Sequence, residues 1–347
     1  MARYLQSLYS RRKVQIRKRM GVISVLVVIT AMVALRYGHH FFGRGEDQTA
    51  AALVNIDVEN ETYTSTVAEP KPVRRDVPEP KPSKIIPEPA SEPNPKAAEL
   101  IEQAVALVNG KPAGMIEARD RLNQALSMPV NNVQRAVIKE NLSRLSDEWL
   151  FSRSVFEQDR LCSRYKVQPG NLLSSIAKEH KVPWEILMEV NKISRPELLK
   201  AGETIKVIHG PFHARVYRST FTMDVYLQDT FVRSFRVGLG RPGRETPTGL
   251  WRVKPGGKLI SPKWTDPDTF KTYKADDPDY PLGSRWIALE GISGEAKDRT
   301  GFAIHGTKNP EQIGTAGSRG CIRLYNGDAI LMYNLLTPGL SRVEVVE

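Results

Sequence analysis

The feature that most constrains this chain is a proline-rich segment between its two ends. Residues 68–96 read AEPKPVRRDVPEPKPSKIIPEPASEPNPK, with about one proline in every three residues. Proline fixes φ and lacks a backbone N–H, so such a segment favours extended polyproline II and buries no core. We therefore expect residues 43–95 to be a disordered, semi-rigid linker that separates the N-terminal segment from the folded domains.

Before this linker, a basic tail precedes an apolar run. Residues 1–20 contain seven Lys or Arg and no Asp or Glu, which is +7 of the formal net charge of +11. The run MGVISVLVVITAMVAL and the aromatic residues after it approach the length of a bilayer-spanning helix, about 30 Å. We expect residues 1–20 to be a cytoplasmic tail and residues 21–42 a single-pass anchor in the inner membrane, with the later domains in the periplasm or cell wall.

Two alternatives to this anchor have less support in the sequence. A cleaved signal peptide would end in an A-x-A-like site, and AMVALRYG offers none that fits well. A nucleic-acid-binding protein would explain a pI near 9.5, but the excess positive charge lies in the tail beside the apolar run. We therefore expect a membrane partner and no nucleic acid.

Helical periodicity follows the linker. Apolar residues recur at spacings of three and four in three successive stretches, which predicts three amphipathic helices. The third stretch begins at Asn131 or Asn132, either of which can cap the helix, and its stripe reaches Trp149 and then Phe156. Residues 96–160 are expected to be an α-helical bundle region, acting as a packing spacer or, as the alternative, as a surface for a partner.

Residues 161–209 contain strand patterns on either side of two short helix patterns. The segments RYKV, LLSSIAKEH, WEILMEVN and TIKVI predict a small βααβ unit, with a Pro-Gly turn after the first. This unit resembles a LysM domain, a family that binds the N-acetylglucosamine-containing glycan of peptidoglycan or chitin. The residues that carry the resemblance are Tyr165, Val167, Gly170, Leu173, Ile176, Ala177, Val182, Leu187, Asn191, Leu199, Gly202 and Ile205.

The LysM resemblance implies glycan binding by Gly170, Asn171, Leu172 and Asn191. One departure bears on this expectation, because the family commonly has Asp-Thr or Asp-Ser where this chain has Asn171 and Leu172. A degenerate domain that only spaces its neighbours is the alternative.

Residues 210–347 show alternating apolar residues and dense Gly and Pro turns, which predict a mainly β domain. One helix is expected, over residues 327–336. The predicted strands are ARVYRS, MDVYLQ, FVRSFRVGL, GLWRVK, RWIALEG, GFAIHG and RVEVVE.

Cys321 lies in this domain, within AGSRGCIRL. The chain has only two cysteines, too few for a disulfide framework, and we expect both Cys162 and Cys321 as free thiols. A catalytic thiol needs a base, a positive field and backbone donors for an oxyanion. Arg319 and Arg323 can supply the field in an extended segment, and Gly320 permits a tight turn. A small buried hydrophobe is the alternative role.

The candidate base is His305, because the other histidines lie near the apolar run, in the LysM-like unit or at the junction between domains. His305 ends the strand pattern GFAIHGT, 16 residues before Cys321. A histidine at a strand end is commonly structural, so spacing alone leaves both roles open.

A second resemblance assigns these residues. AIHGT followed by IGTAGSRGCIRL is similar to the signature of the YkuD-type L,D-transpeptidase catalytic domain, and TPTGLWRV and YPLGSRWIAL resemble two further segments of that family. The resemblance implies a β-sandwich with one or two helices. It implies that Cys321 is the nucleophile and His305 its general base, oriented by the backbone carbonyl of Gly306, with the N–H groups of Gly320 and Cys321 as oxyanion donors.

The same resemblance implies a set of substrate-binding residues. Arg323 is expected to face the donor carboxylate or to hold the loop, and many members have His where this chain has Arg319. Residues 261–281 are expected to form a lid or substrate wall, or otherwise a surface excursion. The implied substrate-binding residues are Ser318, Arg319, Arg323, Trp286 and Tyr280.

The expected activity is peptidoglycan L,D-transpeptidation, in which a thioester on Cys321 is resolved by an amine to give a 3-3 cross-link. Stem peptides and glycan strands are the implied partners, and no metal or organic cofactor is required. Close alternatives keep the thioester and change the acceptor to water, a free D-amino acid or a protein lysine. An alternative of another class is a non-catalytic scaffold that binds the cell wall through LysM.

Overall fold

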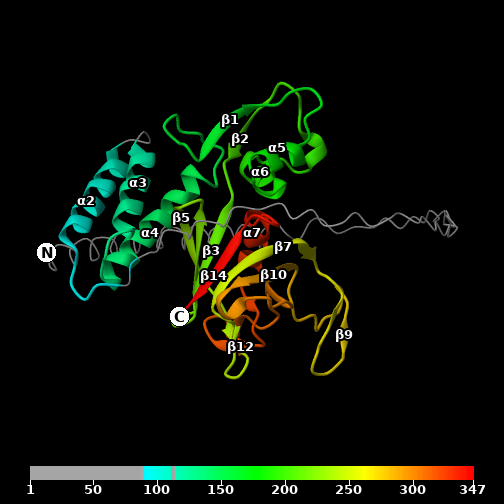
Figure 1. The fold of residues 1–347 in the computed structure, drawn as a ribbon. Helices are drawn as coiled ribbons and strands as arrows, with labels where there is room; N and C mark the ends of the chain where they lie inside the picture. The colour runs from blue at the N-terminus through cyan, green and yellow to red at the C-terminus, as the bar shows by residue number, and fades with distance from the viewer. Residues whose placement is uncertain (1–86, 88, 111–113) are drawn as a thin grey trace, which may run out of the picture. The chain divides into compact units, whose positions relative to one another are not determined.

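The computed structural model describes residue 87, residues 89–110 and residues 114–347 (Figure 1). The expected tail (1–20), the expected anchor (21–42) and most of the expected linker lie outside these residues. Among the helices of the described ranges, none is both long enough and apolar enough to cross a bilayer. All of the described residues belong to one compact unit.

Three helices begin this unit, α2 (Pro95–Gly110), α3 (Met115–Leu126) and α4 (Asn132–Trp149), and they coincide with the three predicted stripes. Asn131 caps α4, since its side-chain oxygen accepts a hydrogen bond from the Gln134 N–H at 2.9 Å. This bond satisfies one of the backbone donors left open at a helix start. The helix ends at Trp149, so Phe156 lies outside it.

The predicted βααβ unit is confirmed. Strand β1 (Cys162–Lys166) pairs antiparallel with β2 (Thr204–Ile208), and α5 (Leu173–Glu179) and α6 (Trp184–Asn191) lie between them in sequence. A 3-10 turn, η2 (Pro196–Leu198), leads from α6 toward β2. Apolar side chains of all four main elements are buried, which explains why so short a segment folds.

Asn191 belongs to the core of this unit, which argues against the expected role of its side chain in glycan binding. Its side chain is 4% exposed. Its Oδ1 accepts from the Lys206 N–H at 2.7 Å, and its Nδ2 donates to the carbonyl oxygens of Leu187 and Lys206 at 2.9 and 2.8 Å. These bonds tie α6 to β2, so all of the polar groups of the side chain are used inside the domain.

The C-terminal region contains an eight-stranded sheet of order β13-β11-β10-β7-β14-β3-β4-β5. All seven predicted strands belong to it, and the eighth, β13, was not predicted. The strands are β3 (Phe212–Tyr217), β4 (Thr222–Leu227), β5 (Thr230–Arg236), β7 (Gly249–Ile260), β10 (Arg285–Ser293), β11 (Phe302–His305), β13 (Ile322–Arg323) and β14 (Arg342–Val346).

The sandwich expected for this region takes the form of one continuous large sheet. The last strand, β14, pairs in parallel with β3 and antiparallel with β7, and so joins the two halves of the sheet. Two small sheets accompany it, made of β6 (Leu239–Gly240) with β12 (Ala316–Ser318) and of β8 (Trp264–Thr265) with β9 (Thr272–Tyr273). Two 3-10 turns, η3 (Gly294–Ala296) and η4 (Pro310–Gln312), lie in its loops.

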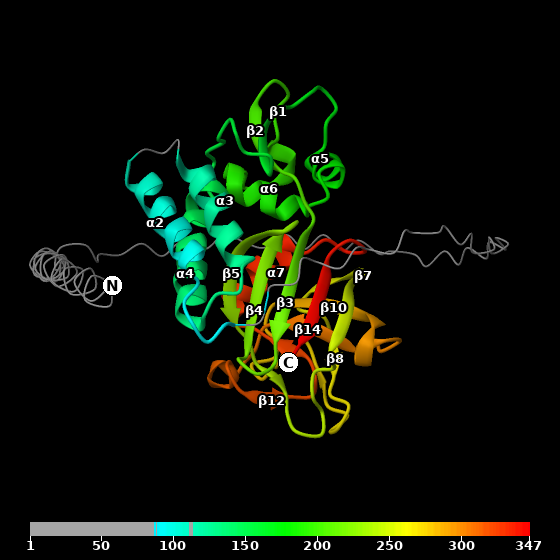
Figure 2. The ribbon, with the colours of Figure 1, turned by 60° about the vertical axis from the view of Figure 1, so that its left-hand side comes forward.

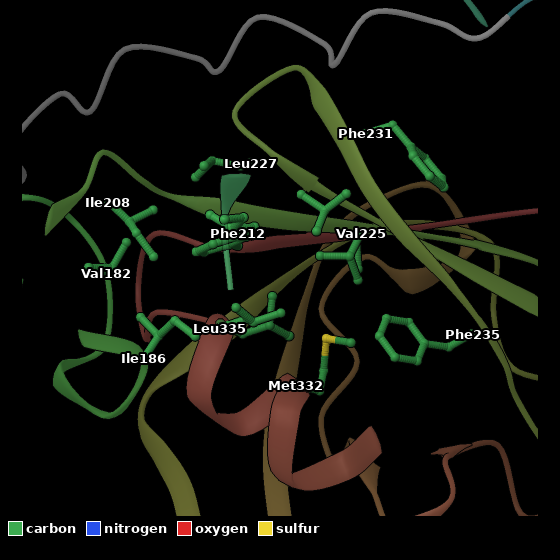
Figure 3. Packing of buried hydrophobic residues seen from close by; sticks show 14 of the residues in the cluster. Val182, Ile186, Ile208, Phe212, Val225, Leu227, Phe231, Phe235, Met332 and Leu335 are labelled. Atoms are coloured by element: carbon green, nitrogen blue, oxygen red, sulfur yellow. The ribbon is translucent and has the colours of Figure 1, made fainter. Parts of the chain in front are cut away.

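One face of the large sheet is apolar and is covered by α7 (Asn326–Leu335), close to the predicted helix at 327–336. Figure 3 shows Met332 and Leu335 of α7 beside Phe212 and Val225 of β3 and β4. These side chains are 0–1% exposed, and they belong to the same apolar cluster as the LysM-like unit. Side chains alternate along each strand, so the residues adjacent in sequence to these apolar ones point to the other face of the sheet, where the candidate site is found.

The helical region is attached to the edge of this sheet. α4 packs against the edge strand β5 (Figure 2), and the backbone N–H of Phe231 in β5 donates to Asn123 Oδ1 at 2.8 Å. On the other side, Lys206 Nζ of β2 donates to the carbonyl oxygens of Trp149 and Ser152, at 2.5 and 3.0 Å. The helical region therefore contacts both of the domains that follow it.

Candidate active site

His305 ends one strand of the large sheet, and Cys321 directly precedes the neighbouring strand. β11 ends at His305 and pairs in parallel with β13, with Ile304 opposite Ile322. Cys321 directly precedes β13, so the same register sets it beside Ala303, two residues before His305. Side chains alternate along a strand, so Ala303, His305 and Cys321 share one face while Ile304 and Ile322 point into the apolar core.

The His305 imidazole is fixed on two sides. Its Nδ1 lies 2.6 Å from the carbonyl oxygen of Gly306, and Trp286 of β10 stacks on the ring with centroids 5.5 Å apart and planes at 17°. Since Nδ1 donates to a carbonyl, the other nitrogen, Nε2, is the acceptor. Trp286, expected to contact substrate, therefore supports the candidate base.

Burial sets the charge of this histidine. The side chain is 3% exposed. Burial lowers the pKa of His305 to about 4, against the opposing effect of hydrogen bonds to the carbonyls of Gly306 and Leu282. At neutral pH the ring is uncharged, as a general base has to be.

The thiol of Cys321 is half-buried, with Sγ 4.0 Å from the carbonyl oxygen of Gly301. Burial raises the pKa of Cys321, although hydrogen bonding from the Ala303 backbone and the charge of Arg323 act in the opposite direction. Arg323 thus supplies part of the expected positive field, but the effect of burial on the pKa is larger. The resting pair is a neutral thiol and a neutral imidazole.

The loop before Cys321 uses its polar groups internally. The N–H of Gly320 donates to Ser318 Oγ at 3.1 Å, and Ser318 Oγ donates to the Cys321 carbonyl at 2.6 Å. Gly320 has φ +113°, and a Cβ there would lie 2.6 Å from the Phe302 ring, so only glycine fits. Because its N–H is engaged, Gly320 does not present the open oxyanion donor that was expected.

Arg319 points to residues 261–281. Its Nε donates to Asp268 Oδ2 at 2.7 Å, and its Nη2 donates to Asp266 Oδ2 at 3.1 Å. Asp268 also pairs with Arg244 at 3.2 Å. The guanidinium therefore connects the loop before Cys321 (residues 318–320, the cysteine loop) to the hairpin β8–β9. Its charge is paired there and does not act on the pKa of the thiol. This contact supports the expected role of residues 261–281 as a wall beside the site.

Two other predicted substrate residues make contacts inside the protein. Arg323 donates to Gln312, and its backbone N–H donates to the Gly238 carbonyl at 2.8 Å, which favours its alternative role of holding the loop. The hydroxyl of Tyr280 donates to the carbonyl of Pro262 at 2.6 Å and joins the two ends of the 261–281 segment.

The predicted LysM glycan residues lie in one turn, apart from Asn191. Gly170 has φ +82° and makes the turn possible. Asn171 Oδ1 accepts from the Gln168 N–H and from the Tyr165 hydroxyl, both at 2.9 Å, so its side chain closes the turn. Leu172 is 64% exposed.

Thr246 and Asn326 are residues of the site that sequence reasoning missed. Thr246 Oγ1 donates to the Gly320 carbonyl at 2.8 Å, and Asn326 Oδ1 accepts from the Thr307 N–H at 3.0 Å. Thr246 belongs to the TPTG segment that resembled the family, but the sequence did not indicate its role. Asn326 is the first residue of α7, and no motif pointed to it.

Cys162, the other thiol, is 1% exposed in β1, and burial raises its pKa to about 12. Both cysteines are unpaired. In the part of the chain that the structure describes, no group of three or more His, Cys, Asp or Glu side chains is arranged to hold a metal ion.

Comparison with known proteins agrees with both resemblances. Residues 211–345 match the model of the L,D-transpeptidase catalytic domain (YkuD), and residues 165–207 match that of the LysM domain. The putative L,D-transpeptidases YkuD of Bacillus licheniformis and Bacillus subtilis are 27% and 28% identical over 188 residues, which is 52% of this chain and 97% of each relative. The probable L,D-transpeptidase YcfS of Escherichia coli is 24% identical over 51% of this chain and 59% of its own length.

Among solved structures, an L,D-transpeptidase from Mycobacterium tuberculosis H37Rv is similar at 20% identity and a TM-score of 0.32, over 42% of this chain and 62% of that protein. Both the two family models and the curated relatives match the part of the chain that contains the candidate residues. This chain thus carries a LysM domain at residues 165–207 followed by an L,D-transpeptidase catalytic domain at residues 211–345.

Proposed function

We propose that this protein transfers acyl groups through a thioester on Cys321, with His305 as the general base. The observation that carries the proposal is the 2.6 Å hydrogen bond between His305 Nδ1 and the Gly306 carbonyl. It selects the tautomer whose Nε2 accepts a proton, on the sheet face that also carries Cys321. The backbone carbonyl takes the part that a carboxylate plays in other triads.

The proposed donor is a peptidoglycan tetrapeptide stem. Sγ of Cys321 attacks the carbonyl carbon of the third residue while the thiol proton moves to His305 Nε2. The C–N bond breaks, and that proton leaves on the amine of D-Ala. A C–S bond, the thioester, remains on Cys321. Because thiol and imidazole are both neutral at rest, proton transfer accompanies the attack.

The second half of the reaction regenerates the thiol. An amine of the diamino acid in another stem attacks the thioester carbon and gives a proton to His305 Nε2. The C–S bond breaks, the proton returns to Sγ, and the product is a 3-3 cross-link. With the Gly320 N–H engaged by Ser318, the Cys321 N–H is the oxyanion donor in this scheme. The residues after the predicted anchor would act in the periplasm, where LysM holds the enzyme on glycan strands.

The test is incubation of the full chain with disaccharide tetrapeptide. We expect release of D-Ala and a Cys321 thioester in the mass spectrum, with dimeric product when a second stem is present. Cys321→Ala should remove all three, whereas Cys162→Ala should retain them because Cys162 is buried in β1, away from the catalytic domain. Full activity of Cys321→Ala would show that Cys321 is not the nucleophile. A wild-type chain without any activity would instead favour the alternative of a non-catalytic scaffold that binds the cell wall.

The same incubation distinguishes the acceptors. Tripeptide without dimer would identify water as the acceptor, and incorporation of an added D-amino acid would identify exchange. Transfer of the tripeptide to a lysine of an added protein would indicate anchoring. Each of these results keeps the thioester and changes only the second step.

A further inference from the structure

Asn326 is connected to the candidate base through a single peptide unit. Its Oδ1 accepts from the Thr307 N–H at 3.0 Å, and the carbonyl of the same peptide unit, that of Gly306, is 2.6 Å from His305 Nδ1. The C=O and N–H of a planar trans peptide point in opposite directions. Fixing the N–H with Asn326 therefore fixes the direction in which the carbonyl meets the imidazole.

The carboxamide oxygen also packs directly on backbone. A Cβ at Gly306 or at Gly283 would lie 2.2 Å from Asn326 Oδ1, so neither position has room for a side chain while Asn326 keeps this place. The peptide unit that precedes Gly283 carries the Leu282 carbonyl, which also hydrogen-bonds to the His305 ring. Asn326 thus lies against both backbone segments whose carbonyls contact the ring.

The position of Asn326 in α7 does not explain these contacts. It is the first residue of the helix, and the N-cap is Tyr325, with no side-chain hydrogen bond to the helix. The side chain of Asn326 bonds instead to a residue 19 positions earlier.

We propose that Asn326 is a positioning residue, whose carboxamide oxygen holds the Gly306–Thr307 peptide so that His305 keeps its proton on Nδ1 and presents Nε2 to Cys321. This inference rests on the proposed role of His305 as the base. Loss of the acceptor oxygen would let the peptide rotate and the two ring tautomers mix. The effect would be on the chemical step more than on substrate binding.

The experiment compares Asn326→Leu, Asn326→Asp and a matched control, Asn334→Leu, in the full chain. Asn334 is on the same helix and contacts Glu189 of LysM at 3.1 Å. Three quantities are measured: the His305 tautomer by nitrogen-15 NMR, assigned with His305→Gln; the pH dependence of Cys321 alkylation; and kcat and KM for D-Ala release.

For Asn326→Leu we expect a mixed tautomer, slower alkylation at neutral pH, and a kcat lower by about 10-fold to 100-fold with KM unchanged. Asn326→Asp keeps an acceptor oxygen and should recover the Nδ1–H tautomer and most of kcat. Asn334→Leu should match wild type in all three.

An unchanged His305 tautomer and alkylation profile in Asn326→Leu would overturn the inference, and so would equal losses in the Leu and Asp variants. If Asn326→Leu does not fold, Asn326→Asp decides, because the inference requires this variant to show a single Nδ1–H tautomer and to keep most of the wild-type kcat. The NMR and alkylation measurements use no peptidoglycan. A wild-type chain that releases no D-Ala would thus refute the proposed function and leave this inference to be judged separately.

Discussion

The ionisation of His305 sets the acid limit expected for the reaction. Burial lowers its pKa from 6.5 to about 4, so the neutral ring is present above about pH 4 and is lost as pH falls through that value. We expect kcat/KM for D-Ala release to show its acid limb near pH 4. A profile from pH 3 to 8 checks this, and a limb near 6.5 would show an exposed imidazole in the free enzyme.

Asn191 offers a prediction about stability. Its side chain makes three buried hydrogen bonds to backbone groups, and truncation leaves those groups without partners. We expect Asn191→Ala to lower the free energy of unfolding by about 2–3 kcal/mol, measured with denaturant. Asn171→Ala, at a half-buried turn, should cost less. Peptidoglycan binding by folded Asn191→Ala should equal that of wild type, and a specific loss of binding would restore its glycan role.

At the residue level, the sequence paired Cys321 with His305 only through the resemblance of their two motifs to one family, because the spacing alone left both roles open. It failed where a role depends on partners from elsewhere in the chain. Thr246 reaches the Gly320 carbonyl from 74 residues away, and Trp286 meets His305 only through the register of β10 and β11. Asn191 was expected to bind glycan because nothing in the adjacent sequence indicated that the backbone N–H of Lys206 would donate to its Oδ1.

Among the elements, alternation of apolar residues located every strand long enough to show it. β13 has two residues, Ile322 and Arg323, which is too short for a pattern, yet it aligns Cys321 with β11. The single large sheet also escaped prediction, because β14 is the last strand in sequence and pairs in the middle of the sheet. Strand identity is local information, whereas strand order depends on the whole domain.

The 261–281 segment gives a prediction at this scale. Its hairpin is joined to the cysteine loop by Asp266 and Asp268, which pair with Arg319. We expect Asp266→Asn/Asp268→Asn to speed tryptic cleavage at Lys263, Lys271 and Lys274 severalfold, because the segment loses its ionic contacts with Arg319. These pairs are partly buried and are screened less than exposed ones, so 1 M NaCl should speed cleavage of the wild type by less than the double substitution does. Asp279→Asn, which affects only the pair with Lys308, is the control.

Cleavage that is equally slow in the double variant would contradict this account of the segment. It would mean that the Tyr280–Pro262 hydrogen bond and the stacking of Trp264 on Tyr273, with centroids 6.0 Å apart, suffice to hold the hairpin.

Across the whole molecule, residues 96–160 do more than separate the linker from LysM. Lys139 of α4 pairs with Asp224 of β4 at 2.5 Å, and the Asp224 side chain is fully buried. Its ammonium also lies over the rings of Tyr217 and Phe231, at 5.2 and 5.7 Å from their centroids. The helical region thus neutralises a charge inside the catalytic domain, which a spacer alone would not do.

This pairing predicts that the helices and the sheet unfold together. Lys139→Met removes the cation and leaves a buried carboxylate with the hydroxyls of Ser234 and Tyr226, so we expect a loss of about 3 kcal/mol in one cooperative denaturant transition. Adding Asp224→Asn to Lys139→Met should recover part of that loss, because the uncompensated charge is gone. If Lys139→Met instead left stability unchanged, or produced two separate transitions, the helical region would be an independent unit. A joint transition would mean that the catalytic domain requires residues 96–160 to fold.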